Sequence, residues 1–145
     1  MQEQTLILIK PDGVNRGLIG KVISRIEEKG YHIISLKITS ASEAILKAHY
    51  NELCDQPYFP GIVEYMTEGP IVAIVAEGTE VIKGFRSLSG PTNPTLAPPG
   101  TIRGDFGRSW DRGAIRNIVH GSDSLENAQR EINLWFPELT SQNVQ

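Results

Sequence analysis

The chain has 145 residues, of which 39% are apolar and 21% charged, and these values predict one globular domain, residues 1–145, with a single core. The formal net charge of −3 argues against a partner such as nucleic acid or a membrane surface, since proteins that bind these carry a basic face. No apolar stretch reaches the roughly 20 residues of a membrane span, and the N-terminal run is too short for a signal peptide. Because Cys54 is also the only cysteine, we expect a cytoplasmic protein.

The first part of the chain predicts a strand, a helix and a second strand. Residues 5–9 (TLILI) form an apolar run typical of a buried strand, which Pro11 and Gly13 end. Residues 17–30 predict a helix whose apolar face holds Ile19, Val22, Ile23 and Ile26. Residues 31–39 alternate in polarity and predict a half-buried strand, with an apolar side made of Ile34, Leu36 and Ile38.

The rest of the chain repeats this alternation after an inserted pair of helices. Ser40 and Glu43 form a capping-box pattern that opens the first helix of the pair. The face of that helix holds Ile45, Leu46, His49, Tyr50 and Leu53. The remaining predicted elements are a short helix at 57–69, a buried strand at 70–78, a helix at 79–90, a short strand at 115–120 and a helix at 122–136. The apolar face of the last helix holds Leu125, Ala128, Ile132 and Trp135.

This order predicts an α/β (α+β) fold of the ferredoxin-like βαββαβ type, a four-stranded antiparallel sheet with helices on its faces. Residues 91–114 are rich in proline and glycine and are expected to form a long loop. A structureless stretch of this length inside a small domain is usually functional.

The segment 117–124 (NIVHGSDS) places His120 between an apolar run and residues that cap helices. The N-terminus of a helix is an anion site, because its first backbone N–H groups have no partner within the helix. Four of the eight arginines fall near this histidine, namely Arg103, Arg108, Arg112 and Arg116. Guanidinium groups bind phosphate oxygens in pairs, so the cluster indicates a polyphosphate ligand. The alternative is a solvated basic loop with a few internal ion pairs.

Neither of the common glycine-rich phosphate loops occurs in the chain, so side chains would have to hold a nucleotide. Lys10 is one candidate, because it follows directly after the buried strand and must leave the core at the edge of the sheet. A lysine that only reaches solvent from a turn is the alternative.

Taken together, these segments resemble the nucleoside diphosphate kinase family in order, spacing and identity. The matching stretches are TLILIKPDGVNRGLIG, HY with PYF, GPTNP, PGTIRGDF, RNIVHGSDS and EINLWF, which extend from residue 4 to about residue 138. The resemblance implies that His120 takes the γ-phosphate of a nucleoside triphosphate, becomes a phosphohistidine and passes the group to a nucleoside diphosphate. It assigns the binding of phosphates and sugar to Lys10, Arg86, Thr92, Arg103 and Asn117.

The resemblance also gives Tyr58 the position on which the base stacks, and makes Tyr50 and Glu131 the residues that position and polarise the histidine. Lys10 is expected to act in catalysis as well as in binding. Mg²⁺ is the implied cofactor, bridging phosphate oxygens with few protein ligands, and Asp123 is a candidate for a contact through water. His32 and His49 match no such role and are expected to be structural.

Four features depart from the family pattern. The segment 107–115 (GRSWDRGAI) is a few residues longer than usual, Pro91 fills the variable position of GxTNP, and TLAP precedes PGTIRGD. The chain also ends early, without a tail that reaches a neighbouring subunit. The resemblance implies a homohexamer, alternatively a homotetramer, and the loop at 90–104 keeps the prolines expected at a threefold contact, Pro91, Pro94, Pro98 and Pro99.

Two other functions remain open from the sequence. The chain could be a nucleotide-binding regulatory module that has lost turnover, or a scaffold that works through an oligomeric surface. The intact set of histidine, lysine, arginine and asparagine favours the kinase over both.

Overall fold

The computed structural model describes residues 2–111 and 113–139. Its four strands are β1 (Gln2–Ile9), β2 (His32–Thr39), β3 (Ile71–Thr79) and β4 (Val119–Gly121). They form one sheet in the order β2-β3-β1-β4, and every neighbouring pair is antiparallel. The predicted ferredoxin-like fold is therefore confirmed.

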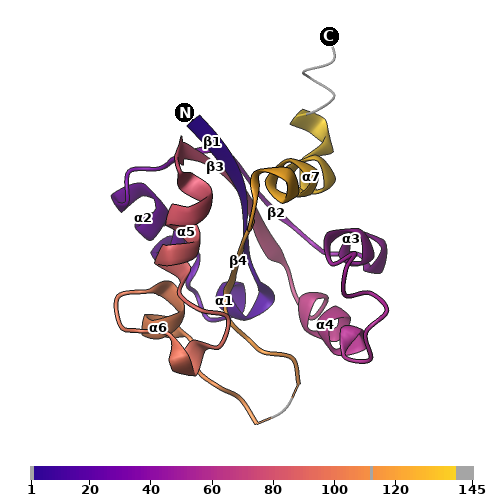
Figure 1. Ribbon diagram of the computed structural model, residues 1–145. Helices are drawn as coiled ribbons and strands as arrows, with labels where there is room; N and C mark the ends of the chain where they lie inside the picture. The colour runs from indigo at the N-terminus through magenta and orange to yellow at the C-terminus, as the bar shows by residue number, and fades with distance from the viewer. Residues whose placement is uncertain (1, 112, 140–145) are drawn as a thin grey trace.

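Helices cover both faces of this sheet (Figure 1). The two crossover helices, α2 (Ile19–Glu28) and α5 (Val81–Ser89), pack on one face. The inserted pair, α3 (Glu43–His49) and α4 (Phe59–Met66), lies on the other face with α7 (Leu125–Trp135). Because β1 lies between two neighbours and under two helix layers, its apolar residues are buried on both sides.

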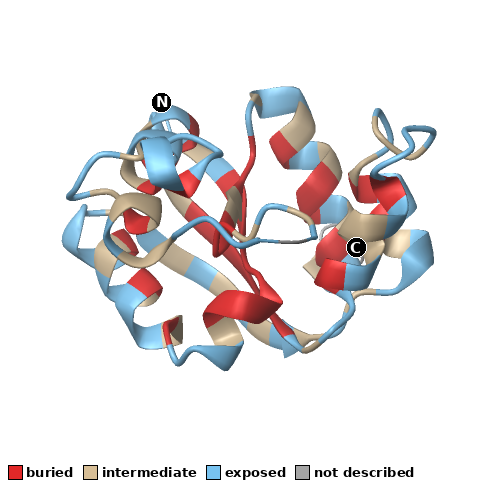
Figure 2. Ribbon diagram, turned by 90° about the horizontal axis from the view of Figure 1, so that it is seen from below, coloured by how far each residue is buried: buried red, intermediate tan, exposed pale blue. Residues whose placement is uncertain are grey.

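The two faces of β1 belong to two separate parts of the core. Ile7 and Ile9 pack on the side of α2 and α5, whereas Leu6 and Leu8 pack on the side of α7. All four side chains are fully buried, and Figure 2 shows buried residues concentrated along the central strands. The continuous apolar run that predicted a buried strand thus reflects burial on both faces.

β2 alternates as predicted, but its apolar side is the more exposed one. Ile34, Leu36 and Ile38 are 46%, 44% and 67% exposed. β2 is an edge strand of the sheet, and its ladder with β3 is irregular between Ile33 and Ser35. A polarity pattern defines two sides of a strand, but it does not say which side the rest of the chain covers.

Smaller differences concern the ends of elements. The N-cap of α3 is Ser42, whose hydroxyl accepts a hydrogen bond of 3.1 Å from the amide of Ile45, so the predicted capping box at Ser40 is wrong. Leu125 is 58% exposed, while the other three residues of the predicted face of α7 are buried.

Three short helices were not predicted. One is α1 (Pro11–Asn15), and two lie inside the expected loop, the 3-10 helix η1 (Pro94–Leu96) and α6 (Ile102–Phe106). Thr101 caps α6 by accepting a hydrogen bond of 2.9 Å from the amide of Gly104. Segments of five residues or fewer are too short to show a helical period. None of the helices in the described ranges is long and apolar enough to cross a membrane.

Candidate active site

His120 lies in the middle of β4, opposite Leu8 of β1. A three-residue γ-turn precedes it, in which the amide of Val119 donates a hydrogen bond of 2.7 Å to the carbonyl of Asn117. The central residue of this turn, Ile118, has a φ of 73°. That left-handed conformation is rare and strained for a β-branched side chain. Because of this turn, the strand that was predicted to begin at residue 115 begins only at Val119.

The strained turn is held by α1 and the end of β1. The carbonyl of Ile118 accepts a hydrogen bond of 2.7 Å from the amide of Lys10. Its amide donates one of 3.2 Å to the carboxylate of Asp12, which also accepts from the hydroxyl of Tyr65. Gly13 makes room for this packing, because a Cβ there would lie 2.8 Å from Ile9 Cγ2 and 3.0 Å from Ile118 Cγ2.

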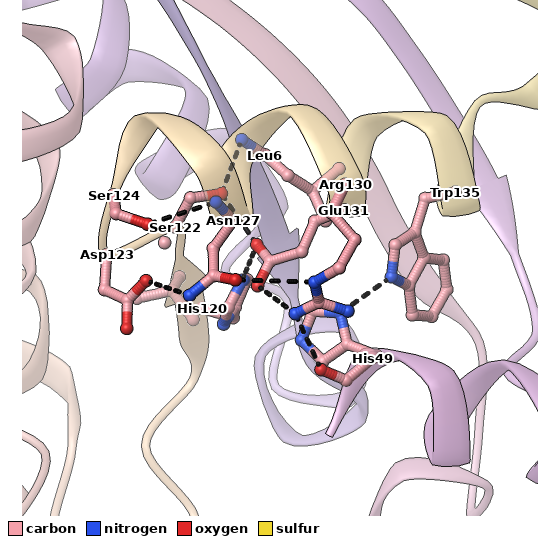
Figure 3. Close-up of polar contacts among 12 residues, drawn as sticks. Leu6, His49, His120, Ser122, Asp123, Ser124, Asn127, Arg130, Glu131 and Trp135 are labelled. Carbon is pink, nitrogen blue, oxygen red and sulfur yellow. Dashed lines mark hydrogen bonds and ion pairs between the residues drawn. The ribbon is translucent and has the colours of Figure 1, made fainter. Parts of the chain in front are cut away.

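The imidazole of His120 is oriented by a buried carboxylate (Figure 3). Its Nε2 lies 2.8 Å from Oε1 of Glu131, which also accepts a hydrogen bond of 2.7 Å from the hydroxyl of Ser122. Ser122 in turn accepts from the amide of Leu6, 3.1 Å away in β1. A carboxylate is an acceptor, so it places the proton of a neutral His120 on Nε2 and leaves the lone pair on Nδ1.

A buried lysine and a half-buried arginine flank the γ-turn. Lys10 Nζ donates a hydrogen bond of 2.7 Å to Oδ1 of Asn117. Burial, followed by the charge of Arg103, lowers the pKa of Lys10 from 10.5 to about 7, against an opposing effect of Asp12. Burial and the nearby Arg86 lower the pKa of Arg103 to about 10.

Arg103 is tied to the backbone by three hydrogen bonds. Its guanidinium donates to the carbonyls of Asn117, Gly90 and Val119 at 3.1, 2.8 and 2.6 Å. The side chain therefore fastens the loop before α6 to both ends of the γ-turn. Three of its five N–H groups are used in this way.

All nine predicted site residues line three cavities that share walls. The largest, about 670 Å³, is lined in part by Lys10, Tyr50, Tyr58, Thr92 and Asn117. Tyr50 also lines a cavity of about 230 Å³, together with Arg86, His120 and Glu131. Arg86 and Arg103 line the third, of about 410 Å³. The structure thus brings together residues that the sequence spreads over more than a hundred positions.

The arginine cluster does not form a single site. Of its members, Arg103 lines the cavities just described, whereas Arg108 stacks over the ring of Trp110 at 3.6 Å. Arg116 forms a salt bridge with Glu68. Arg112 lies outside the described residues. Proximity along the chain grouped these side chains, but the three that the structure describes, Arg103, Arg108 and Arg116, have different partners.

His49 was expected to be structural, yet it lies against His120. It is 4% exposed, and the centroids of the two rings are 4.5 Å apart. The one signal in the sequence was its position next to Tyr50. Potential ligand atoms of His49, His120 and Glu131 lie within 4.8 Å of one another. Two imidazoles and one carboxylate do not suit Mg²⁺, which prefers oxygen ligands.

A ferredoxin-like sheet that presents a carboxylate-bound imidazole beside a buried lysine and a half-buried arginine is the arrangement expected of a phosphotransferase that acts on nucleotides. The comparisons with known proteins name the family. The family model for nucleoside diphosphate kinase matches residues 3–140, and the chain belongs to this family of enzymes.

Relatives from distant organisms agree. The nucleoside diphosphate kinase of Columba livia is 55% identical over 92% of this chain and 85% of its own length. That of Thermobifida fusca is 54% identical over 94% and 98%. Among solved structures, a transition-state mimic of the enzyme from Borrelia burgdorferi with bound vanadate and ADP has a TM-score of 0.87 at 36% identity, covering 93% of this chain and 87% of that one.

Proposed function

We propose that this enzyme transfers the γ-phosphate of a nucleoside triphosphate to a nucleoside diphosphate through a phosphohistidine on Nδ1 of His120. The observation that carries the proposal is the 2.8 Å contact between His120 Nε2 and Glu131, which commits one ring nitrogen and leaves the other as the nucleophile. The neutral imidazole with its proton on Nε2 has a free lone pair on Nδ1 and is therefore the form that can attack.

The reaction balances in two steps at one nucleophile. The Nδ1 lone pair attacks the γ-phosphorus, the bond from phosphorus to the β,γ-bridging oxygen breaks, and the diphosphate leaves with that electron pair. The imidazole ring then carries a positive charge, which Glu131 stabilises from Nε2. An oxygen of the acceptor's terminal phosphate attacks the same phosphorus in the second step and restores the neutral ring.

Cationic and polar side chains around the cavities would position the nucleotide. Lys10, Arg86 and Arg103 would spread over the phosphate charge, and most catalysis of phosphoryl transfer is positioning and electrostatics. Asn117 and Thr92 would contact sugar and phosphate, since they line the cavity beside Lys10. Tyr58, 54% exposed in that cavity, offers its ring to the base, and Tyr50 stands where two cavities meet.

Mg²⁺ fits this site as a companion of the nucleotide. Asp123 lines the same cavity as His120 and Arg86, and a hydrogen bond from Asn127 holds the pKa of Asp123 below its usual value. Its carboxylate would hold the ion through water while phosphate oxygens fill most positions. When bound, the ion neutralises charge on the transferring group.

We further propose a homohexamer, with a homotetramer as the alternative, in the cytoplasm. The exposed apolar side of β2 supports self-association, because Ile34, Leu36 and Ile38 lie on one side of an edge strand. Pro91, Pro94, Pro98 and Pro99 lower the entropy cost of fixing their loop at a contact.

Incubation with ATP labelled at the γ-phosphate tests the proposal. The protein is expected to gain acid-labile, alkali-stable phosphate and to release it as triphosphate when a diphosphate is added. His120→Ala should gain none while it still binds ADP. A parent protein that binds nucleotide without becoming labelled would favour the regulatory module, and one that binds no nucleotide would favour the scaffold.

A further inference from the structure

The structure places a second imidazole against the proposed nucleophile. His49 ends α3, and its ring stands nearly perpendicular to that of His120, at 71°. We propose that His49 is a positioning residue that fixes the plane of the His120 ring; this inference rests on the proposed role of His120 as the nucleophile.

The bond to Glu131 alone does not fix the ring of His120. A single hydrogen bond at Nε2 holds one edge of the imidazole but permits the ring to rock about the axis of that bond. A perpendicular ring whose centroid lies 4.5 Å away opposes this motion. The direction of the Nδ1 lone pair matters, because attack on phosphorus requires aligned atoms about 3–3.5 Å apart.

His49 is itself held in one tautomer. Its Nδ1 accepts a hydrogen bond of 3.0 Å from the indole N–H of Trp135, which can only donate. The proton of His49 is therefore on Nε2, a buried atom with no hydrogen-bond partner among the described residues. An unpaired buried N–H is costly, so it is retained where the ring itself serves a purpose.

His49 also adds no charge to the site. Burial, followed by the charges of His120, Lys10 and Arg130, lowers its pKa to about 2. It is therefore neutral near pH 7 and does not compete with His120 for Glu131 as an ionic partner. This separates a positioning role from that of a general acid or base.

One helix, α7, positions both residues that contact the ring of His120, namely Glu131 and His49 (Figure 3). Glu131 and Trp135 lie one turn apart on it; the first contacts His120 directly, and the second acts through His49. Arg130 of the same helix donates to the carbonyls of Ala48 and His49 at 2.7 and 3.3 Å. The end of α3 is thus fastened to α7 by its backbone and by its side chain.

Two substitutions separate the ring from its anchor. His49→Asn keeps an acceptor near the position of Nδ1 for Trp135 but removes the ring edge that meets His120. His49→Phe keeps a ring but leaves the indole N–H of Trp135 unpaired. His32→Asn, at an exposed histidine of β2, is the matched control.

Single-turnover phosphorylation of His120 by ATP is measured beside the dissociation constant of ADP and the melting temperature. His49→Asn should slow the phosphorylation of His120 by about 10- to 100-fold, while the dissociation constant of ADP should change by less than about twofold. Compared with His49→Asn, His49→Phe should lower the melting temperature more and slow the phosphorylation of His120 less. The imidazole ¹⁵N shifts of His120 should report the Nε2–H tautomer in both proteins, because Glu131 is unchanged, whereas NMR relaxation should show greater motion of the His120 ring in His49→Asn.

Phosphorylation of His49→Asn within about twofold of the parent rate would overturn the inference, as would equal losses of rate and ADP affinity. If that variant does not fold, Trp135→Phe replaces it, with a rate loss of several-fold expected and an unchanged rate contradicting the inference. Failure of the parent to become phosphorylated would instead refute the proposed function.

Discussion

The ammonium of Lys10 donates a hydrogen bond of 2.7 Å to the side-chain oxygen of Asn117, and this bond joins the end of β1 to the turn that precedes His120. Lys10 is 9% exposed, and its pKa is lowered to about 7. A cation buried beside Arg103 is a source of instability, which the phosphate proposed to bind there would relieve. Function and stability therefore oppose each other at this position.

Lys10→Met should stabilise the nucleotide-free protein below pH 7 and abolish transfer. In the parent, the folded state holds Lys10 with a pKa of about 7 against 10.5 when unfolded, so the cost of burying the charge is fully present below pH 7. Between pH 7 and 10.5 Lys10 loses its proton in the folded state first, so the free energy of unfolding of the parent rises with pH. The stability advantage of the variant shrinks over the same range. Thermal unfolding across pH measures it, with the exposed Lys29→Met as control. A variant less stable than the parent at pH 6 would contradict the expectation.

Glu131→Gln should slow phosphoryl transfer by about a hundredfold, because the amide keeps the shape of the side chain but not the charge that stabilises the phosphorylated ring. ADP binding should change little, since Glu131 contacts the nucleophile and does not line the cavity that holds Lys10, Tyr58 and Asn117. Stopped-flow measurement of both half-reactions checks this. Glu126→Gln, in the exposed first turn of α7, serves as the comparison and should retain the parent rate.

Tyr58→Ala should weaken the binding of ATP, GTP, CTP and UTP by similar amounts. The expected loss is about 1–3 kcal/mol for each, which is the contribution of a base stacked on an aromatic ring. Tyr58→Phe keeps the ring and should bind like the parent. Values of kcat/KM for the four donors provide the measurement. A parent that accepts one base and rejects the others by about 10⁴ would contradict stacking, because such ratios require hydrogen bonds to the base edge.

Ile38→Glu should dissociate the proposed oligomer into smaller species, since it places a charge at the most exposed of the three apolar residues Ile34, Leu36 and Ile38 on β2. Leu125→Glu, at an exposed leucine of α7, is the control and should leave the mass unchanged. Light scattering after size exclusion measures both. A parent with the mass of one chain at micromolar concentration would refute self-association, and an Ile38→Glu variant of parental mass would exclude β2 from the contact.

The sequence by itself determined the order of the strands and long helices. A run such as TLILI and the spacing of Val22 and Ile26 carry a local period, and local periods arise from backbone geometry that neighbours only reinforce. The segments around Lys10 and His120 likewise carried the resemblance that assigned the residues of the candidate site, because the order and spacing of motifs are properties of the sequence alone.

The tertiary structure decided everything that depends on two distant segments meeting. Contacts between elements far apart in the chain decide which side of β2 is covered and which arginine of the cluster lines a cavity. Such contacts also hold Ile118 at a positive φ. His49 shows this most clearly, since its helical spacing marks a core residue and is correct about burial. Only the packing of α3 on α7, through Trp135, turns that burial into a contact with His120.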